Sequence, residues 1–160
     1  MEAFVTHPFA PVCGEGARLL ILGSFPSVRS REEGFYYGHP RNRFWQVLAR
    51  IYGEPVPASV PEKRALLFSH GLALWDVVSS CRVTGSSDAS IREAEPNDIP
   101  GLCAASGITR VFANGRTAAA LYRRAGFAPE ITVLPSTSPA NAAWSVSALA
   151  DAWGKALLLQ

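Results

Sequence analysis

Three loop segments of this chain carry the residues best suited to chemistry. The first is GSFPS, residues 23–27, in which Gly23 allows a sharp turn and a close approach of the backbone to a ligand. Ser24 and Ser27 add two hydroxyl groups. Neither GxxxxGKS/T nor GxGxxG is present, so the standard phosphate-binding loops are excluded. A plain turn after a strand explains the pentapeptide about equally well.

The second segment, residues 35–45 (FYYGHPRNRFW), interleaves aromatic side chains with arginines. This pattern suits stacking on nucleobases beside contacts to phosphates. The two tyrosines lie among glycines and are hard to explain as core residues, whereas Phe44 and Trp45 fit a hydrophobic core. Asn42 precedes an apolar helical pattern, so a role as a helix cap is an alternative to a role in chemistry.

The third segment, residues 134–141 (LPSTSPAN), places three hydroxyl side chains between two prolines. Such a loop is stiff and offers several donors, which could hold a phosphate or the edge of a sugar. The alternative is a rigid turn that caps the last helix of the chain.

Metal and cofactor chemistry find little support in the composition. Cys13, Cys81 and Cys103 are scattered and odd in number, and no CxxC pair occurs. One chain therefore cannot build a four-cysteine zinc or iron–sulfur site. The histidines are isolated as well, so we expect reduced thiols, no metal and no cofactor.

The overall composition is that of a globular protein. The 160 residues are 48% hydrophobic and 18% charged, which predicts one domain over residues 1–160. No apolar run approaches the ~20 residues that a membrane helix needs. The N-terminal residues lack the pattern of a signal peptide, so a cytoplasmic protein without a membrane partner is expected.

The net charge of +2 at pH 7 permits nucleic-acid binding but does not argue for it. Thirteen of the fifteen basic residues are arginines, and five of these lie within residues 29–50. Arginine makes forked contacts to phosphate, so this segment could hold a polyanion. A solvated surface is the simpler interpretation of the charges alone.

Apolar runs and helical patterns alternate along the chain. Strands are predicted at residues 18–23, 72–78, 108–113 and 130–134, and helices at 42–52, 61–68, 101–106, 116–125 and 145–158. Residues 24–41 and 81–100 read as irregular. The alternation predicts an α/β fold with a mostly parallel sheet, in which ligands bind outside the carboxyl ends of the strands.

Four blocks then match a known family in order along residues 18–150: LLILGSFPS, YYGHPRNRFW, VFANG and LPSTSPAN. Together they resemble the uracil-DNA glycosylase superfamily and, within it, the hypoxanthine-DNA (deoxyinosine) glycosylase branch. The second block is also similar to mismatch-specific uracil/thymine glycosylases. The resemblance implies a three-layer αβα sandwich with a four-stranded, mostly parallel sheet.

The resemblance also implies roles for individual residues. Asn42 aligns with an asparagine used in catalysis, where it would orient a water through its side-chain oxygen. Tyr37 aligns with the aromatic residue that stacks on the extruded base. The other residues expected in the base pocket are Gly23, Ser24, Phe25, Pro26, Asn114 and Asp76. Those expected to contact DNA are Ser136, Thr137, Ser138, Pro139 and Arg41.

Several of these assignments have simpler alternatives. Asp76 could read the edge of a base or merely cap a loop, and Asn114 could be a turn residue of an Asn-Gly pair. The segment Ser86-Ser87-Asp88 could help to read the base.

This chain departs from most relatives in two of the matching blocks, GSFPS and LPSTSPAN. The three residues after Gly23 (Ser24, Phe25 and Pro26) include no carboxylate or amide, and Ser136 stands where the uracil-specific enzymes have histidine. Iron–sulfur branches of the superfamily are excluded by the cysteine count.

The reaction implied is hydrolysis of the N-glycosidic bond of a flipped, deaminated base in double- or single-stranded DNA. Hypoxanthine is the first expectation and uracil the second. The only lysines, Lys63 and Lys155, lie outside the site segments, so a monofunctional enzyme that leaves an abasic site is predicted. The alternatives are a non-catalytic DNA-binding member of the fold and a small-molecule nucleoside or nucleotide hydrolase.

Overall fold

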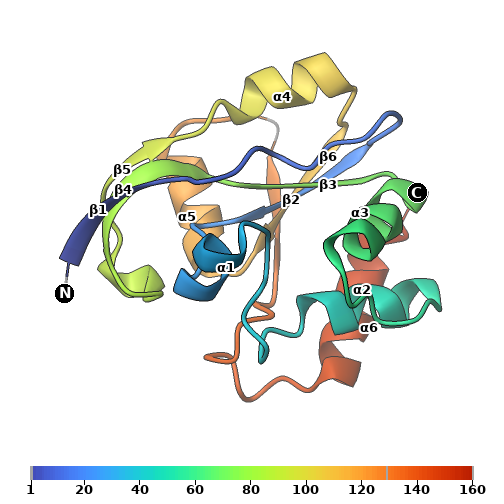
Figure 1. Ribbon diagram of the computed structural model, residues 1–160. Coiled ribbons are helices and arrows are strands. Elements are labelled where there is room, and N and C mark those ends of the chain that lie inside the picture. Colours follow the sequence, from blue (N-terminus) through green and yellow to red (C-terminus); the bar gives the residue numbers. More distant parts are fainter. Residues whose placement is uncertain (1, 129, 160) are drawn as a thin grey trace.

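A four-stranded parallel sheet forms the centre of the computed structural model, which describes residues 2–128 and 130–159. Its strand order is β3-β2-β6-β7 (Figure 1). The strands are β2 (Leu19–Gly23), β3 (Leu72–Asp76), β6 (Arg110–Asn114) and β7 (Ile131–Leu134). All four were predicted from the sequence as short apolar runs, and β2 is buried almost throughout, whereas the two middle residues of the edge strand β7 are exposed.

Helices cover both faces of this sheet, as the three-layer prediction requires (Figure 1). One face carries α2 (Phe44–Tyr52), α3 (Val60–Ser69) and α6 (Val146–Leu157), and the other carries α4 (Ile99–Ser106) and α5 (Arg116–Arg124). Successive strand residues point to opposite faces. Accordingly, Ile21 packs with the first group of helices, and Leu20 and Leu22 pack with the second. Among the described residues, no helix is long and apolar enough to cross a membrane.

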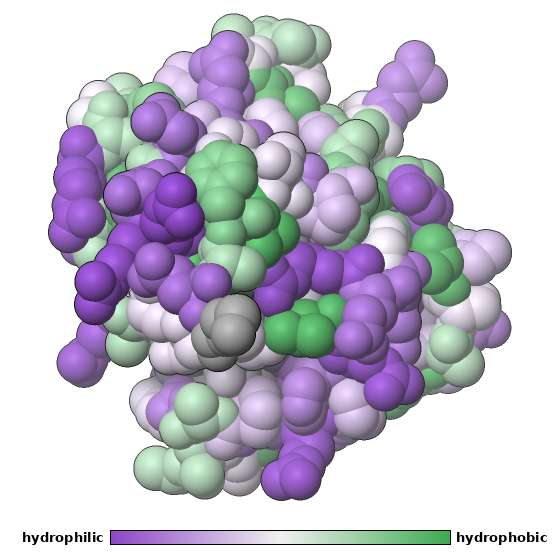
Figure 2. All heavy atoms as spheres, turned by 60° about the vertical axis from the view of Figure 1, so that its left-hand side comes forward, coloured by the Kyte–Doolittle hydropathy of each residue, from purple (hydrophilic) through white to green (hydrophobic). Residues whose placement is uncertain are grey.

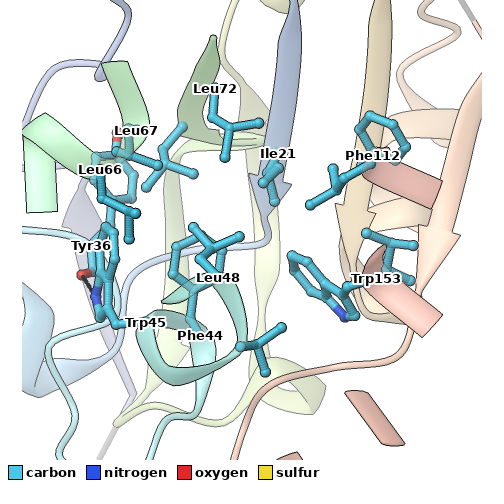
Figure 3. Close-up of a cluster of buried hydrophobic side chains, with 14 of the residues drawn as sticks. Ile21, Tyr36, Phe44, Trp45, Leu48, Leu66, Leu67, Leu72, Phe112 and Trp153 are labelled. Carbon is cyan, nitrogen blue, oxygen red and sulfur yellow. Dashed lines mark hydrogen bonds between the residues drawn. The ribbon is translucent and has the colours of Figure 1, made fainter. Parts of the chain in front are cut away.

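The larger core cluster lies on the first of these faces and is rich in aromatic residues (Figure 3). Trp153 of α6 is fully buried and donates its indole N–H to the carbonyl of Pro135, 2.8 Å away. Trp45 of α2 donates its indole N–H to the carbonyl of Tyr36 at 3.3 Å. Tyr36 is only 2% exposed, so the prediction that it lies outside the core is wrong. These contacts fix two loops of the candidate site to the core.

A second, three-stranded antiparallel sheet was not predicted. It has the order β1-β4-β5 and consists of β1 (Glu2–Thr6), β4 (Val78–Thr84) and β5 (Arg92–Pro96). The prediction of an irregular segment over residues 81–100 is therefore wrong. Register shifts between β4 and β5 disturb the period-two pattern that marks a half-buried strand. Figure 2 shows the side of the molecule that carries this sheet, where hydrophilic residues predominate and hydrophobic ones are scattered.

Two short helical segments complete the fold, and both lie in stretches predicted to be irregular. α1 (Val28–Glu33) begins after Ser27, whose side chain accepts from the backbone N–H of Ser30, and ends at Gly34 with φ 74°. A 3₁₀ turn, η1 (Asp88–Ser90), lies between β4 and β5. The backbone N–H of Val28 donates to the Ser86 hydroxyl at 2.9 Å. The second sheet thus delivers its β4–β5 loop to the carboxyl end of β2.

Candidate active site

A cavity of about 380 Å³ opens at the carboxyl ends of the parallel strands. Its lining comes from the ends of β2, β3 and β6, from the loop between α1 and α2, from the β4–β5 loop and from the loop after β7. The predicted residues that line it are Gly23, Ser24, Phe25, Pro26, Tyr37, Asn42, Asp76, Asn114, Ser136, Thr137 and Ser138. Arg41 and Pro139 lie outside this lining, although their neighbours Asn42 and Ser138 belong to it.

Thr137 joins three of these segments and is fully buried. Its hydroxyl donates to Oδ1 of Asn42 at 2.8 Å and accepts from Nδ2 of Asn114 at 2.9 Å. Its backbone N–H donates to Oδ1 of Asn114 at 3.0 Å. The hydroxyl thus uses both its donor and an acceptor position, and the two amide side chains are held in place through it.

The position of the Asn42 amide bears on its predicted chemistry. Its Oδ1 accepts not only from Thr137 but also from the backbone N–H of Phe44 at 3.0 Å. Because a backbone N–H can only donate, this contact assigns the oxygen to that side of the amide. Two donors therefore occupy the oxygen that was expected to orient water, and the amide nitrogen is the group left for a ligand. The bond to Phe44, the first residue of α2, also ties Asn42 to the start of this helix, whose N-cap residue is Arg43.

Arg43 shapes the loop after β7 and was assigned no role from the sequence. Its guanidinium donates to the carbonyl groups of Ser138 at 2.8 Å, Asn141 at 3.0 Å and Trp144. Its backbone N–H donates to the carbonyl of Thr137 at 3.1 Å. No described carboxylate pairs with this arginine. The Arg43 guanidinium instead donates to carbonyl groups of the loop after β7, and we infer that it positions this loop.

Asp76 ends β3 and forms a buried pair with His7, a residue that sequence analysis missed. Nε2 of His7 lies 2.8 Å from Oδ2 of Asp76, and the two side chains are 4% and 5% exposed. Nδ1 of His7 accepts from the backbone N–H of Phe9 at 3.4 Å. Nε2 must then carry the proton that it donates to the carboxylate. This pairing holds the Asp76 carboxylate through Oδ2 and leaves Oδ1 free of His7.

Gly23 pairs with Asp76 in the register of the sheet, and its lack of a side chain is essential there. A Cβ atom at Gly23 would lie 2.4 Å from Oδ1 of Asp76 and 3.1 Å from the hydroxyl of Tyr37. Gly23 was predicted to let the backbone approach a ligand; in the structure, the groups that come close are the protein's own Asp76 and Tyr37 side chains.

Tyr37 is held in a strained conformation at the cavity wall. Its φ is 54°, in the left-handed region that costs a non-glycine residue about 1–3 kcal/mol. Its ring stacks on that of Phe44, with 4.0 Å between the ring centroids. Its hydroxyl is buried and finds no hydrogen-bond partner among the described residues. Burial first, and then the charge of Asp76, raises the pKa of this hydroxyl well above its usual value, so it is a neutral donor.

Asp88 reaches the cavity from the β4–β5 loop, together with Ser86 and Ser87. Its Oδ1 accepts from the hydroxyl of Ser24 at 2.6 Å. Desolvation of the carboxylate by its surroundings raises the pKa of Asp88, although the residue as a whole is exposed; the Ser24 hydrogen bond opposes this rise and the charge of Asp76 adds to it. From the sequence, Asp88 was a candidate, with Ser86 and Ser87, to help read the base. Among the described residues no cluster of three or more His, Cys, Asp or Glu side chains could hold a metal.

Comparison with known proteins now places the chain in a family. Residues 10–157 match the family model of the uracil DNA glycosylase superfamily. The chain belongs to this superfamily. A hypoxanthine DNA glycosylase of Methanosarcina acetivorans is 37% identical over 146 residues, covering 88% of this chain and 91% of that protein. One of Methanosarcina barkeri is 34% identical over 138 residues, covering 83% and 86%.

A solved structure agrees with this placement of the glycosylase. The solution NMR structure of a Methanosarcina acetivorans protein, provisionally assigned as a uracil DNA glycosylase, aligns with a TM-score of 0.77. The two sequences are 32% identical, and the match covers 99% of this chain and 100% of the other. The predictions of the superfamily, of the α/β fold and of a DNA glycosylase are confirmed.

The contact geometry at Gly23 gives a sharp test of the cavity. We expect Gly23→Ala to lower base excision by about 100-fold or more, since the added Cβ must displace Asp76 or Tyr37 and misplaced groups lose that much rate. Single-turnover kinetics measures this. Gly154→Ala in α6 is the matched control, because its Cβ would meet only Ile51, at an ordinary 3.7 Å. Near-native excision by Gly23→Ala would contradict the described packing.

Proposed function

We propose that this glycosylase excises hypoxanthine from DNA, with uracil as a second substrate, and leaves an abasic site. The observation that carries the proposal is the Asp76 carboxylate, buried at the end of β3 and oriented by His7. Two relatives that are each named a hypoxanthine DNA glycosylase support the same substrate.

The base edge that a carboxylate recognises distinguishes deaminated bases from their parents. An ionised carboxylate only accepts hydrogen bonds. Hypoxanthine and uracil each present a ring N–H beside a carbonyl group, where adenine and cytosine present a ring nitrogen with a lone pair. Oδ2 of Asp76 is occupied by His7, which leaves Oδ1 to accept from that ring N–H. An acceptor facing the lone pair of adenine or cytosine would instead repel it, and unpaired buried groups cost about 1–3 kcal/mol.

Asn42 is the residue we propose to act on the reacting bond. The C1′–N bond breaks, its electron pair passes to the base, and water supplies the hydroxyl group that C1′ gains. The Asn42 amide nitrogen would donate to a substrate atom that gains negative charge, while Thr137 and the N–H of Phe44 hold its oxygen. A fixed donor of this kind contributes on the order of 3 kcal/mol.

A monofunctional reaction fits the positions of the lysines. A strand-cutting glycosylase needs an amine nucleophile. Neither Lys63, whose ammonium group lies 5.3 Å from the ring centroid of Trp45, nor Lys155 of α6 lines the cavity. Water is therefore the nucleophile we propose.

The loop after β7 is the proposed contact to the DNA backbone. Ser136 and Ser138 line the cavity, and Arg43 holds the loop in one shape. Pro139 and the exposed Arg41 adjoin the lining residues Ser138 and Asn42 in the sequence, and we propose that they contact DNA phosphates.

Excision from defined oligonucleotides tests the proposed substrate. Duplex and single-stranded DNA carrying inosine, uracil, a G·T mismatch or only normal bases would be incubated with excess enzyme, followed by alkali to cut abasic sites. We expect release from inosine to be fastest, uracil to follow, and adenine to remain, because only the first two present a ring N–H to Asp76. Release from uracil alone would refute the hypoxanthine assignment. DNA binding without any release would favour a binding module, and release from free nucleosides alone a small-molecule hydrolase.

Substitution of Asn42 separates its two possible roles. We expect Asn42→Ala to lower single-turnover excision by about 100-fold or more through loss of the donor. Loss of the hydrogen bonds to Thr137 and Phe44 should lower the free energy of unfolding by about 1 kcal/mol, measured by urea denaturation. Asn42→Asp is the discriminating variant, because it keeps an oxygen for Thr137 and Phe44 but removes the amide N–H. Native activity in Asn42→Asp would show that the oxygen, and not the nitrogen, does the chemistry.

A further inference from the structure

Two carboxylates line the active-site cavity, and their surroundings differ. Asp76 is committed to His7 through Oδ2. Asp88 forms no ion pair with any described residue, and only the Ser24 hydroxyl donates to its side chain, through Oδ1. The Oδ2 atom of Asp88 therefore remains without a described donor. A carboxylate that is held by a hydrogen bond at one oxygen, and has no donor at the other, can accept a proton at that second oxygen.

The Asp88 carboxylate is held in place by the fold. The 2.6 Å bond from Ser24 is short, as expected when a hydroxyl donates to a charged oxygen. The β4–β5 loop, which carries Asp88, is bound to α1 by two hydrogen bonds. The Val28 N–H donates to the Ser86 hydroxyl at 2.9 Å, and the Arg31 guanidinium donates to the Gly85 carbonyl at 2.9 Å. The antiparallel sheet thus brings the Asp88 carboxylate next to residues 23–27 (GSFPS) at the end of β2. These five residues include no carboxylate of their own.

We propose that Asp88 is the catalytic base that activates the attacking water; this rests on the glycosylase reaction proposed above. Oδ2 of Asp88 would accept one proton of the water as the water oxygen forms its bond to C1′. The C1′–N bond breaks at the same time, and its electron pair passes to the base. The departing base gains a proton from solvent, and Asp88 returns its proton to solvent, so that one water is consumed for each base released.

The charge of Asp88 would contribute as well as its basicity. The sugar gains positive charge as the glycosidic bond breaks, and a nearby fixed anion stabilises that charge. The titratable groups that line the cavity with Asp88 are Asp76, Tyr36, Tyr37 and His39, and Arg31 binds the β4–β5 loop that carries Asp88. Of these, Asp76 opposes ionisation of Asp88, and desolvation does so more strongly, so its pKa is raised above that of an ordinary aspartate. A raised pKa makes the carboxylate a stronger base.

The direction in which the excision rate changes with pH follows from the protonation state in which Asp88 is active. The ionised carboxylate is the base, so excision is lost as the pH falls through the pKa of Asp88. Because that pKa is raised, we expect the loss at a higher pH than an exposed aspartate would give. Removal of the Ser24 hydroxyl takes away the contact that lowers this pKa, and should move the acid limb further upward. A purely structural role for Asp88 would produce neither shift.

The test compares wild-type enzyme with Asp88→Asn on duplex DNA containing inosine, under single turnover and across a pH series. The asparagine oxygen can still accept from Ser24, so fold and DNA affinity should be retained, as checked by thermal unfolding and equilibrium binding. We expect excision at neutral pH to fall about 100-fold or more and the acid limb to disappear. Asp151→Asn, on an exposed position of α6, is the matched control and should stay within about twofold of wild type.

The outcomes separate this proposal from the function on which it rests. If wild-type enzyme releases no base from any oligonucleotide, the proposed function fails and the role of Asp88 fails with it. If wild type is active and Asp88→Asn keeps its rate and its acid limb, only the role of Asp88 is refuted. Should Asp88→Asn not fold, Ser24→Ala decides the matter. An acid limb shifted to higher pH supports the proposal, and an unchanged limb refutes it.

Discussion

The buried hydroxyl of Thr137 is the contact on which the rest of the site depends. It joins Asn42, before α2, to Asn114, at the end of β6, with hydrogen bonds of 2.8 and 2.9 Å. Both its donor and an acceptor position are used, and a buried polar group is stable only when so satisfied. Arg43 then holds the remainder of the loop through carbonyl groups. Two amides and one loop, far apart in sequence, are thereby presented to the same cavity as one rigid unit.

The electrostatics of the cavity match the reaction of a glycosylase. Two carboxylates face a space in which a sugar gains positive charge, and His7 supplies orientation to Asp76 without needing a positive charge itself. The neutral Tyr37 hydroxyl and the Asn42 amide nitrogen are two donors that no described residue engages. In the proposed binding mode, Oδ1 of Asp76 accepts from a ring N–H, whereas the same oxygen would repel the lone pair of adenine or cytosine. We propose that this arrangement favours deaminated bases over their parents.

The parallel sheet and its strand-end site could be predicted from the sequence because their signals are local. Residues 18–23 form an apolar run that ends in glycine, and the polar loops follow such runs directly. The contacts that complete the site are not local. His7 meets Asp76 across 69 residues, and Asp88 meets Ser24 across 64, so no spacing in the sequence marks either pair. The antiparallel sheet that delivers Asp88 was hidden by register shifts in its own strands.

The coupling of Asn114 to the loop through Thr137 can be measured directly by a double-mutant cycle. Single-turnover excision would be compared for wild type, Thr137→Val, Asn114→Ala and the double variant. Residues in one hydrogen-bonded unit lose their contributions together, so the double variant should be little slower than the slower single variant, with a coupling energy of about 1 kcal/mol or more. If the two losses simply add, the two residues act independently, and the rigid unit centred on Thr137 does not govern the site.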